Sequence, residues 1–576
     1  MKNKEIAKLF NEISEYLEME GVAFKPYAYQ KAAMTLETLQ DDLGDLYRRG
    51  GVKALKKIPG IGESMALKIE EYLTTGKMQY YEDFKAKMPI NLDEIVGVAG
   101  VGPKKAKVLF DQLGIKTLAD LEEAAQAHKI APLFGFGPKT EENILQGIEF
   151  LKTGKGRFLL GDILPLAQGV LEKLRSLPEV EQADTAGSLR RLKETIGDVD
   201  FLVISSNPDR VMDFFVNLPG VVKVWGHGNT KSSVRLQEGL DMDLRVIPPA
   251  SYGAALQYFT GSKEHNIALR KIAIDQGYKL SEYGLFQGDT PVAAATEEEV
   301  YAKLGMAWIP PELREDRGEI PAAQAGKLPE LIGYQDIKGD VHVHSNWNGG
   351  KQSIREIAAA ARERGYEYVG ISDHTQFLKI ERGLDEEQLR ARNKEIEEIN
   401  QELKKSGVNF TVLKGCEANI MADGSIDILD EALAEMDYVI AGVHSQFKMD
   451  REEMTRRIIT AMENPHVDII SHPTGRLLKK REEYDISLDR ILAAARATRT
   501  VLEINAYPER LDLNDLNIHL CKNMGIKMVI NTDTHQVEQL GLMPFGIGQA
   551  RRGWAEKADI INAWPVEKFL QMLKGF

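Results

Sequence analysis

Three aspartates on two expected strands are the residues of this chain best placed to do chemistry. Asp198 and Asp200 interrupt an apolar run at 196–204, and Asp243 interrupts a second run at 240–247. Residues two apart on a strand face the same side, so Asp198 and Asp200 should lie together. Carboxylates beside an apolar run are costly unless a cation neutralises them, and Mg²⁺ prefers such oxygen ligands together with substrate phosphates. The pattern therefore predicts a site for two-metal nucleotidyl transfer.

A short arm upstream of these aspartates offers groups that bind phosphate. Gly187 and Ser188 open an expected helix, whose first N–H groups and hydroxyl can reach a phosphate, and Arg191 adds a fixed positive charge. The alternative is that the three aspartates are ordinary acids at strand ends. A pair of aspartates alone would leave that alternative open, but the arm, the pair and the third aspartate together favour a functional site.

The arm and the aspartates resemble the nucleotidyltransferase palm of family X DNA polymerases, and the stretch 258–262 continues the match. The resemblance implies that Asp198 and Asp200 bind two Mg²⁺ or Mn²⁺ ions and that Asp243 activates the primer 3′-hydroxyl. It also implies a group of residues around the nucleotide: Gly187, Ser188 and Arg191 at the triphosphate, Tyr258 and Phe259 at the sugar, and Gly261 and Asn266 near the base. Arg270 completes this stretch and is expected to bind DNA.

A second group of chemistry-bearing residues lies after residue 335, where eight of the 11 histidines fall. Most of these histidines lie in short polar motifs, and nearly every motif follows a short β-type run. We therefore expect a metal-binding set at strand ends: His342, His344, His374, Glu417, His444, His472, Asp533 and His535. A single histidine is more often a structural hydrogen-bonding residue than a ligand. The whole set is too costly to hold together without cations, and its mixed ligands suit Mn²⁺, Zn²⁺ or Fe²⁺.

Helical patterns separate these strands, at 354–364, 385–405, 451–463 and 487–498. Repeated strand–helix units with polar residues at strand ends predict a (β/α) barrel, with seven units, and a site on its carboxyl face. The motifs resemble the PHP (polymerase and histidinol phosphatase) domain, a metal-dependent phosphoesterase, which implies a cluster of two or three ions.

Position 349 departs from that family, which usually has an aspartate there. Gly349 cannot ligate, so we expect one ion to be weakly held or absent, unless Asn348 or water substitutes. Asp373 is expected to support a neighbouring ligand rather than to bind metal itself. Arg510 is either a contact for substrate phosphate or a solvated arginine.

Glycine-rich turns punctuate the helical patterns of the amino-terminal part. Gly60 and Gly62 form one copy, Gly100 and Gly102 a second, and 134–140 a looser third. Each turn leaves N–H groups that can reach a phosphate at the start of the next helix. The copies resemble the helix-hairpin-helix motif, which grips DNA backbone without reading sequence. A plain helix–helix turn is the alternative for any one copy.

Lys68 follows the first of these turns. In the polymerase beta branch of the family the corresponding lysine forms a Schiff base with an abasic sugar, which implies a lyase here. Such an amine needs a depressed pKa. Ser64 stands where that branch has a further lysine, and the alternative is an exposed helical lysine near phosphate.

The composition is that of an ordinary soluble protein from a reducing compartment. The 576 residues exceed what one core holds, and the chain is 43% hydrophobic and 28% charged. It has two cysteines and no apolar run long enough to cross a membrane, and we expect no signal peptide because residues 1–5 lack an apolar core. Net charge is −14, but residues 1–160 are neutral, so we expect modest, salt-sensitive DNA affinity. We expect a cytoplasmic monomer that binds no membrane.

These observations predict a multidomain α+β and α/β chain. The expected segments are a helical DNA-binding or lyase-like domain (1–80), helix-hairpin-helix fingers (81–155), a nucleotidyltransferase palm (156–249), a thumb (250–315), a linker (316–334) and a PHP (β/α)7 barrel (335–576). The resemblance implies a DNA-dependent DNA polymerase that uses dNTPs to fill short gaps in nicked or gapped DNA during base excision repair. The barrel would add 3′→5′ exonuclease activity and processing of abasic sites or blocked 3′ ends. One alternative is a repair nuclease with a slow or vestigial polymerase. The other is a DNA-bridging scaffold, and the three palm carboxylates argue against this scaffold.

Overall fold

The computed structural model describes residues 2–37, 39, 43–58, 60–96, 98, 101–152 and 156–574. The chain divides into two compact units, Met1–Gly156 and Arg157–Phe576, and each is described by itself. Within the described residues, no helix combines the length and the apolar character that crossing a bilayer needs.

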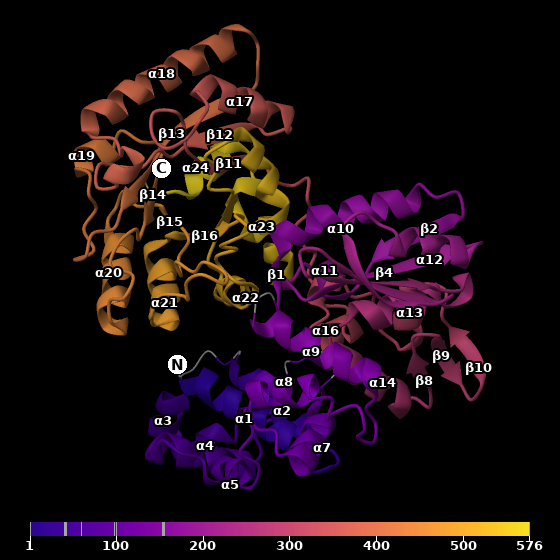
Figure 1. The fold of residues 1–576 in the computed structure, drawn as a ribbon. Coiled ribbons are helices and arrows are strands. Elements are labelled where there is room, and N and C mark those ends of the chain that lie inside the picture. Colours follow the sequence, from indigo (N-terminus) through magenta and orange to yellow (C-terminus); the bar gives the residue numbers. More distant parts are fainter. Residues whose placement is uncertain are drawn as a thin grey trace. The chain divides into compact units, whose positions relative to one another are not determined.

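The first unit is helical, as the spacing of its apolar residues predicts (Figure 1). Its core is continuous from Ile6 to Ile148 and includes stacked aromatic rings such as Tyr16 and Phe84. Its helices are α1 (Lys2–Met19), α2 (Lys25–Glu37), α3 (Leu43–Leu55), α4 (Glu63–Thr75), α5 (Gln79–Lys87), α6 (Leu92–Val96), α7 (Pro103–Leu113), α8 (Leu118–Gln126) and α9 (Pro138–Lys152).

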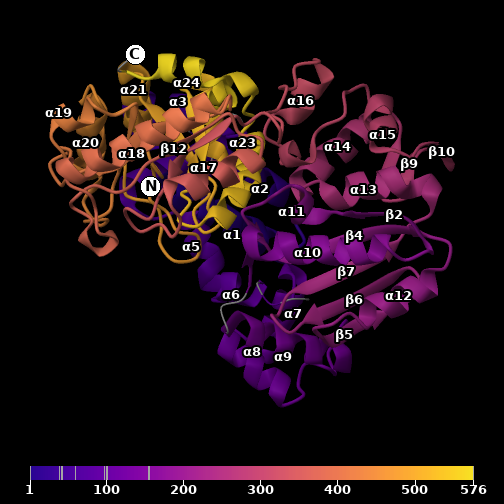
Figure 2. The ribbon, with the colours of Figure 1, turned by 90° about the horizontal axis from the view of Figure 1, so that it is seen from above.

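The second unit opens with a five-stranded sheet in the order β2-β4-β7-β6-β5, whose strands lie side by side in Figure 2. Its elements are β1 (Phe158–Leu159), α10 (Leu160–Arg175), β2 (Val180–Thr185), α11 (Gly187–Arg190), β3 (Thr195–Ile196), β4 (Asp198–Ser205), α12 (Pro208–Val216), β5 (Val221–His227), β6 (Lys231–Leu236) and β7 (Asp241–Val246). Alternate residues of β4, such as Val199 and Phe201, pack in one core with α10 and α12. The others, Leu202 and Ile204, face a second core formed with residues that follow Pro249.

Those following residues form helices and a small antiparallel sheet in the order β10-β9-β8. The elements are η1 (Pro249–Ser251), α13 (Tyr252–Thr260), α14 (Lys263–Asp275), β8 (Lys279–Ser281), β9 (Gly284–Gln287), β10 (Thr290–Ala293), α15 (Glu297–Lys303), η2 (Pro311–Leu313) and α16 (Glu319–Gln324).

The expectation of a linker over 316–334 is wrong for its first half, which is folded. Glu319 opens α16, and Ile320 and Ala323 are buried in the core of the preceding helices. The carboxylate of Glu319 lies 2.6 Å from Nδ1 of buried His265. Proline, alanine and glycine suggested a linker, but these tertiary contacts override composition.

The rest of the second unit is a parallel sheet in the order β11-β12-β13-β14-β15-β16-β17. A bridge between Val343 and Thr534 joins its first and last edges, so the seven strands form a nearly closed barrel. Figure 1 shows α17, α18, α20 and α21 around its outside. The elements are β11 (Gly339–Val343), α17 (Ile354–Glu363), β12 (Tyr368–Ile371), η3 (Lys379–Glu381), α18 (Glu386–Lys405), β13 (Thr411–Asn419), α19 (Asp430–Leu433), β14 (Tyr438–Gly442), α20 (Arg451–Glu463), β15 (Ile469–Ile470), α21 (Leu488–Thr498), β16 (Val501–Asn505), α22 (Asp515–Met524), β17 (Met528–Asn531), η4 (Val537–Leu542), α23 (Met543–Arg552), η5 (Lys557–Asp559), η6 (Ile561–Ala563) and α24 (Val566–Met572).

The barrel's interior changes from apolar to polar along its strands. Phe569 of α24 packs with Tyr368 and Tyr438, the first residues of their strands, so α24 lies against the amino ends. Leu413 of β13 belongs to this apolar cluster. Alternate residues of a strand face the same side, so Glu417, four residues later on β13, also faces the interior of the barrel. The polar site therefore lies at the carboxyl ends, where a parallel barrel places chemistry.

Candidate active sites

The three palm aspartates meet on one face of the five-stranded sheet. Because β4 and β7 are parallel neighbours, Asp200 lies directly opposite Asp243, and Asp198 lies two pairs earlier, opposite Asp241. Asp198 and Asp200 share the side of Leu202, away from the core with α10 and α12. The structure thus brings together all three carboxylates that the sequence singles out.

The charges of this cluster are poorly balanced by the protein. Burial, and then the neighbouring Asp198 and Asp243, raise the pKa of Asp200 to about 7. Burial and Asp243 also raise the pKa of Asp198. Lys231 lies 2.5 Å from one oxygen of Asp243 and offsets part of the charge. An oxygen-only cluster whose ionisation is disfavoured in this way fits a divalent cation.

Gly187 brings the arm that is expected to bind phosphate close to these acids. It has φ +63°, and a Cβ at this position would lie 2.7 Å from a carboxylate oxygen of Asp200. The left-handed φ favours glycine, and a side chain here would also displace the carboxylate of Asp200. Ser188, the next residue, is partly exposed beside them.

The two arginines of the arm have different partners. Arg190 makes a two-pronged contact with Glu297, at 2.8 and 2.9 Å, which fastens the arm to α15. Arg191, the expected triphosphate ligand, donates to Glu315 (3.1 Å) and to the carbonyl of Thr260 (2.6 Å). These two hydrogen bonds use Nε and Nη1 of Arg191.

Glu315 ties this arginine to the barrel. It accepts a hydrogen bond at 3.0 Å from Arg552 at the end of α23, and the same guanidinium nitrogen donates to the carbonyl of Arg191 (2.8 Å). Burial alone would raise the pKa of Glu315, but Arg552, Lys193 and Arg191 lower it to about 2. Asp515, at the start of α22, takes the other side of Arg552.

The stretch expected to hold the nucleotide forms the turn between α13 and α14. Asn266 donates to the carbonyls of Tyr258 (2.7 Å) and Gly261 (3.2 Å), and a Cβ on Gly261 would lie 2.5 Å from the Asn266 amide oxygen. Asn266 therefore fixes the shape of the turn. Phe259 packs edge-on against Tyr258, and Arg270 is partly exposed one turn after Asn266.

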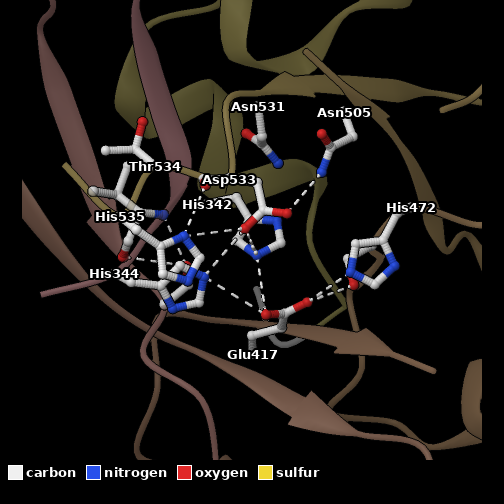
Figure 3. A network of polar contacts seen from close by, with 12 residues as sticks. His342, His344, Glu417, His472, Asn505, Asn531, Asp533, Thr534 and His535 are labelled. Carbon is white, nitrogen blue, oxygen red and sulfur yellow. Dashed lines mark hydrogen bonds and ion pairs between the residues drawn. The ribbon is translucent and has the colours of Figure 1, made fainter. Parts of the chain in front are cut away.

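Glu417 is the centre of the second site (Figure 3). One carboxylate oxygen lies 3.1 Å from His342, 3.6 Å from His344 and 2.9 Å from His374. The other lies 3.2 Å from both His444 and His472. The two oxygens thus serve two separate sets of imidazoles, as a carboxylate that bridges two cations would.

Three overlapping groups in the barrel could each hold an ion. In each group the candidate ligand atoms lie within 4.8 Å of one another; the groups are His342, His344 and Asp533, then His374, Glu417 and His444, and then His344, His374 and His535. Every residue of the expected set except His472 belongs to one of them, and His472 faces Glu417.

Unpaired ring nitrogens test whether these residues suit a metal. Although they are buried, Nε2 of His342, both nitrogens of His344, Nδ1 of His374 and Nε2 of His444 make no hydrogen bond within the described chain. Buried polar atoms are normally paired. Unpaired imidazole nitrogens that face a carboxylate fit a cation between them, because both groups can donate a lone pair to it. The donor set suits Mn²⁺, Zn²⁺ or Fe²⁺.

Glu503 of β16 supports the ligands, and the sequence reading missed it. Its two oxygens accept from Nδ1 of His342 (2.6 Å) and from the backbone N–H of His472 (2.7 Å). Asn419 contacts Nδ1 of His444 in the same way, at 2.8 Å. Both contacts leave Nε2 as the nitrogen directed at the metal. A sequence signal existed, because Glu503 interrupts an apolar strand as Glu417 does.

Asp373 and Arg510 lie next to the expected ligands. Asp373 accepts from the backbone N–H (2.6 Å) and hydroxyl (2.9 Å) of Ser345 and pairs with buried Arg392, so it supports the segment after His344. Arg510 lies 3.5 Å from a carboxylate oxygen of Asp533, and one of its buried nitrogens has no partner within the described chain. This placement favours contact with substrate phosphate over a solvated arginine.

The glycine turns of the first unit place bare helix starts at the surface. Gly62 and Gly102 precede α4 and α7, and among the described residues no side chain caps either helix. Gly60, Gly62 and Gly102 are exposed and Gly60 has φ +82°, whereas Gly100 lies outside the described residues. Free N–H groups at exposed helix starts can bind phosphate.

Lys68 projects from α4 and is partly buried. Its amine donates to the hydroxyl of Ser64 (2.8 Å) and lies 4.5 Å from the ring centre of Tyr80. Burial lowers the pKa of Lys68, against the opposing charge of Glu71. The shift is in the direction that a nucleophilic amine needs.

Comparisons with known proteins agree with this arrangement. Family models match for a helix-hairpin-helix domain (1–78), a SAM-like helix-hairpin-helix tandem (92–149), the DNA polymerase beta thumb (255–315) and the PHP domain (340–507). The "DNA polymerase/3′-5′ exonuclease PolX" of Bacillus subtilis is 38% identical over 579 residues, covering 100% of both chains. "DNA polymerase lambda" of Arabidopsis thaliana is 27% identical over 352 residues, 54% of this chain and 62% of the relative. A "probable phosphatase" of Syntrophotalea carbinolica is 32% identical over 234 residues, 39% of this chain and 86% of the relative. Full-length similarity and the two metal-type sites together identify the chain as a member of the family X DNA polymerases that carry a PHP domain.

Proposed function

We propose that this chain is a DNA-dependent DNA polymerase that fills short gaps in base excision repair and whose barrel removes nucleotides or blocking groups from 3′ ends. The observation that carries the proposal is the facing pair Asp200 and Asp243 beside the arm at Gly187, in the same unit as a histidine-rich barrel site. The first arrangement suits synthesis with Mg²⁺ or Mn²⁺, and the second suits hydrolysis.

In the palm, Asp198, Asp200 and Asp243 would hold two ions and orient the primer end. When bound, the ions supply Lewis-acid activation of the 3′-hydroxyl and neutralise charge on the triphosphate. Gly187 and Ser188 of the arm bind the phosphates. Asp243, opposite Asp200, activates the primer 3′-hydroxyl. Tyr258, Phe259 and Gly261 border the sugar and base, with Asn266 holding their turn.

In the barrel, Glu417 and the surrounding imidazoles would hold the ions, and Asp533 and His535 would complete the set. When bound, these ions supply Lewis-acid activation of water and of the scissile phosphodiester. Arg510 orients the phosphate through its free nitrogen. Glu503 holds His342 in the tautomer that directs Nε2 inward.

The remaining segments would position the DNA. Residues 1–80 and 81–155 grip the backbone through Gly60, Gly62, Gly100 and Gly102. Residues 156–249 perform synthesis, 250–315 close on the nascent pair with Arg270 against DNA, and 335–576 hydrolyse. Neutral overall charge in the first 160 residues fits binding that depends on a few phosphate contacts.

A time course on a one-nucleotide-gapped duplex with Mg²⁺ or Mn²⁺ tests the proposal. We expect one-nucleotide extension with dNTPs and 3′ trimming without them, and loss of both in a chelator, because both sites depend on cations. Trimming without extension would support the repair nuclease with a vestigial polymerase. Tight binding with neither reaction would support the DNA-bridging scaffold.

For Lys68 we propose the lyase role, and reductive trapping tests it. With borohydride and a duplex that carries a 5′ abasic sugar, the wild-type chain should form a covalent adduct through an imine at this amine. Lys68→Ala should remove the adduct, whereas Lys77→Ala, an exposed lysine just after α4, should retain it. Equal trapping by both variants would leave Lys68 as a phosphate contact.

A further inference from the structure

Position 349 of the barrel is filled from a distant part of the chain. A Cβ on Gly349 would lie 2.8 Å from a carboxylate oxygen of Glu381 and 3.5 Å from the ring of His535. The space where a ligand side chain at 349 would begin is therefore already occupied by a carboxylate, next to a predicted ligand. We infer that Glu381 is a metal ligand of the barrel and supplies the carboxylate that Gly349 lacks.

The neighbouring group of ligands is the one that needs such a residue. His344, His374 and His535 bring ring nitrogens within 4.8 Å of one another without a carboxylate of their own, whereas the other two groups include Asp533 or Glu417. Three neutral imidazoles leave the full charge of a divalent ion unbalanced at a largely buried place. A carboxylate from Glu381 reduces that charge.

The loop that carries Glu381 starts at one of these histidines. The N–H of Leu384 donates to the carbonyl of His374 (2.8 Å), which closes the loop that contains η3. A Cβ on Gly383 would lie 1.9 Å from the carbonyl oxygen of Thr375, so the backbone at the two ends of the loop is in close contact. Glu381, the last residue of η3, is thus held close to His374 by a short, closed segment.

Asn348 fastens the same loop, and this decides against its acting as the replacement ligand. Its amide donates to the carbonyl of Glu381 (2.6 Å), and its oxygen accepts the backbone N–H of His374 (3.0 Å). The side chain is 1% exposed and is committed at both ends. Asn348 therefore positions Glu381 relative to His374, and the carboxylate remains available.

The backbone at 349 does not by itself require glycine. Its φ is +57°, a conformation that aspartate and asparagine tolerate better than other side chains do. Gly350 is different, because a Cβ there would lie 2.2 Å from the carbonyl oxygen of His344. The closest atom that a side chain at 349 would meet is the carboxylate oxygen of Glu381, so an aspartate at 349 would compete with Glu381 for the same space.

The number of ions bound per chain tests whether Glu381 is a ligand. The inference rests on the proposed metal-dependent hydrolase. The full chain is loaded with Mn²⁺ or Zn²⁺, passed through a desalting column and analysed for ions per chain, and affinities are taken from calorimetric titration. We expect three barrel ions in the wild-type chain after subtraction of palm ions with Asp200→Ala as background. Glu381→Gln should keep two and weaken the third by at least about tenfold. Glu387→Gln, an exposed acid at the start of α18, is the matched control and should keep all three.

The exchange variant guards against a merely structural effect. Gly349→Asp alone should leave the count at three and should not tighten the third ion, because two carboxylates would compete for one space. Gly349→Asp with Glu381→Ala should restore it. If Glu381→Gln keeps the wild-type count and affinities, or if the wild-type barrel holds only two ions, the inference is overturned while the hydrolase proposal stands. If the wild-type barrel binds no ion, the hydrolase proposal itself fails.

Discussion

Alanine in place of Asp200 is expected to lower nucleotide incorporation by at least about a thousandfold, or about 4 kcal/mol of transition-state stabilisation, while 3′ trimming continues. Asp200 lies opposite Asp243 and against Gly187, so its loss removes the carboxylate shared by both expected palm ions. Primer extension on the gapped duplex measures the change. The variant should fold at least as well as the wild type. Burial and its acidic neighbours raise the pKa of Asp200 to about 7, so its ionised form costs folding free energy at neutral pH.

A matched control separates this effect from a general loss of negative charge. Asp209 is an exposed aspartate in the first turn of α12, and Asp209→Ala should extend primers at the wild-type rate. Incorporation by Asp200→Ala within about tenfold of the wild-type rate would show that the palm assignment is wrong.

Glutamine in place of Glu417 is expected to have the second large effect, on hydrolysis. Each oxygen of Glu417 faces a different set of imidazoles at 2.9 to 3.6 Å, and a neutral amide cannot bridge two cations with both atoms. We expect loss of at least two barrel ions and a fall of about a thousandfold or more in 3′ trimming, with gap filling retained. Elemental analysis and digestion of a labelled 3′ end give the two readings.

Glu431→Gln serves as the control for this change, because Glu431 is an exposed acid in α19 of the same barrel. It should keep both the ions and the trimming. Full trimming by Glu417→Gln at unchanged metal content would remove the barrel site from the reaction.

Much of the barrel was predictable because its pattern is local. The helix expected at 451–463 is α20 with the same bounds, and the strand ends carry the eight expected ligands. In a parallel barrel, carboxyl ends of strands converge on one face, so motifs far apart in sequence necessarily meet. The palm was predictable for the same reason, since Asp200 and Asp243 lie on adjacent parallel strands.

Residues outside regular patterns could not be found in this way. Glu381 lies on a short loop whose closure depends on Gly383 and Asn348, and no spacing in the sequence links it to Gly349. The segment after Asp316 resembles a linker in composition, but Ile320 and Ala323 are buried by contacts with helices that precede them. Such features depend on tertiary contacts, which override local preference.

The contact between Arg552 and Glu315 has a consequence for how such a chain can change over evolutionary time. The positive partner of the glutamate that holds Arg191 comes from α23, more than 200 residues after Glu315 in the chain. A substitution at Arg552 selected for its effect on degradation would also alter the residue expected to meet an incoming nucleotide. The contacts of Arg191 therefore depend on a residue of the barrel, and a change on one side of this contact should be felt on the other.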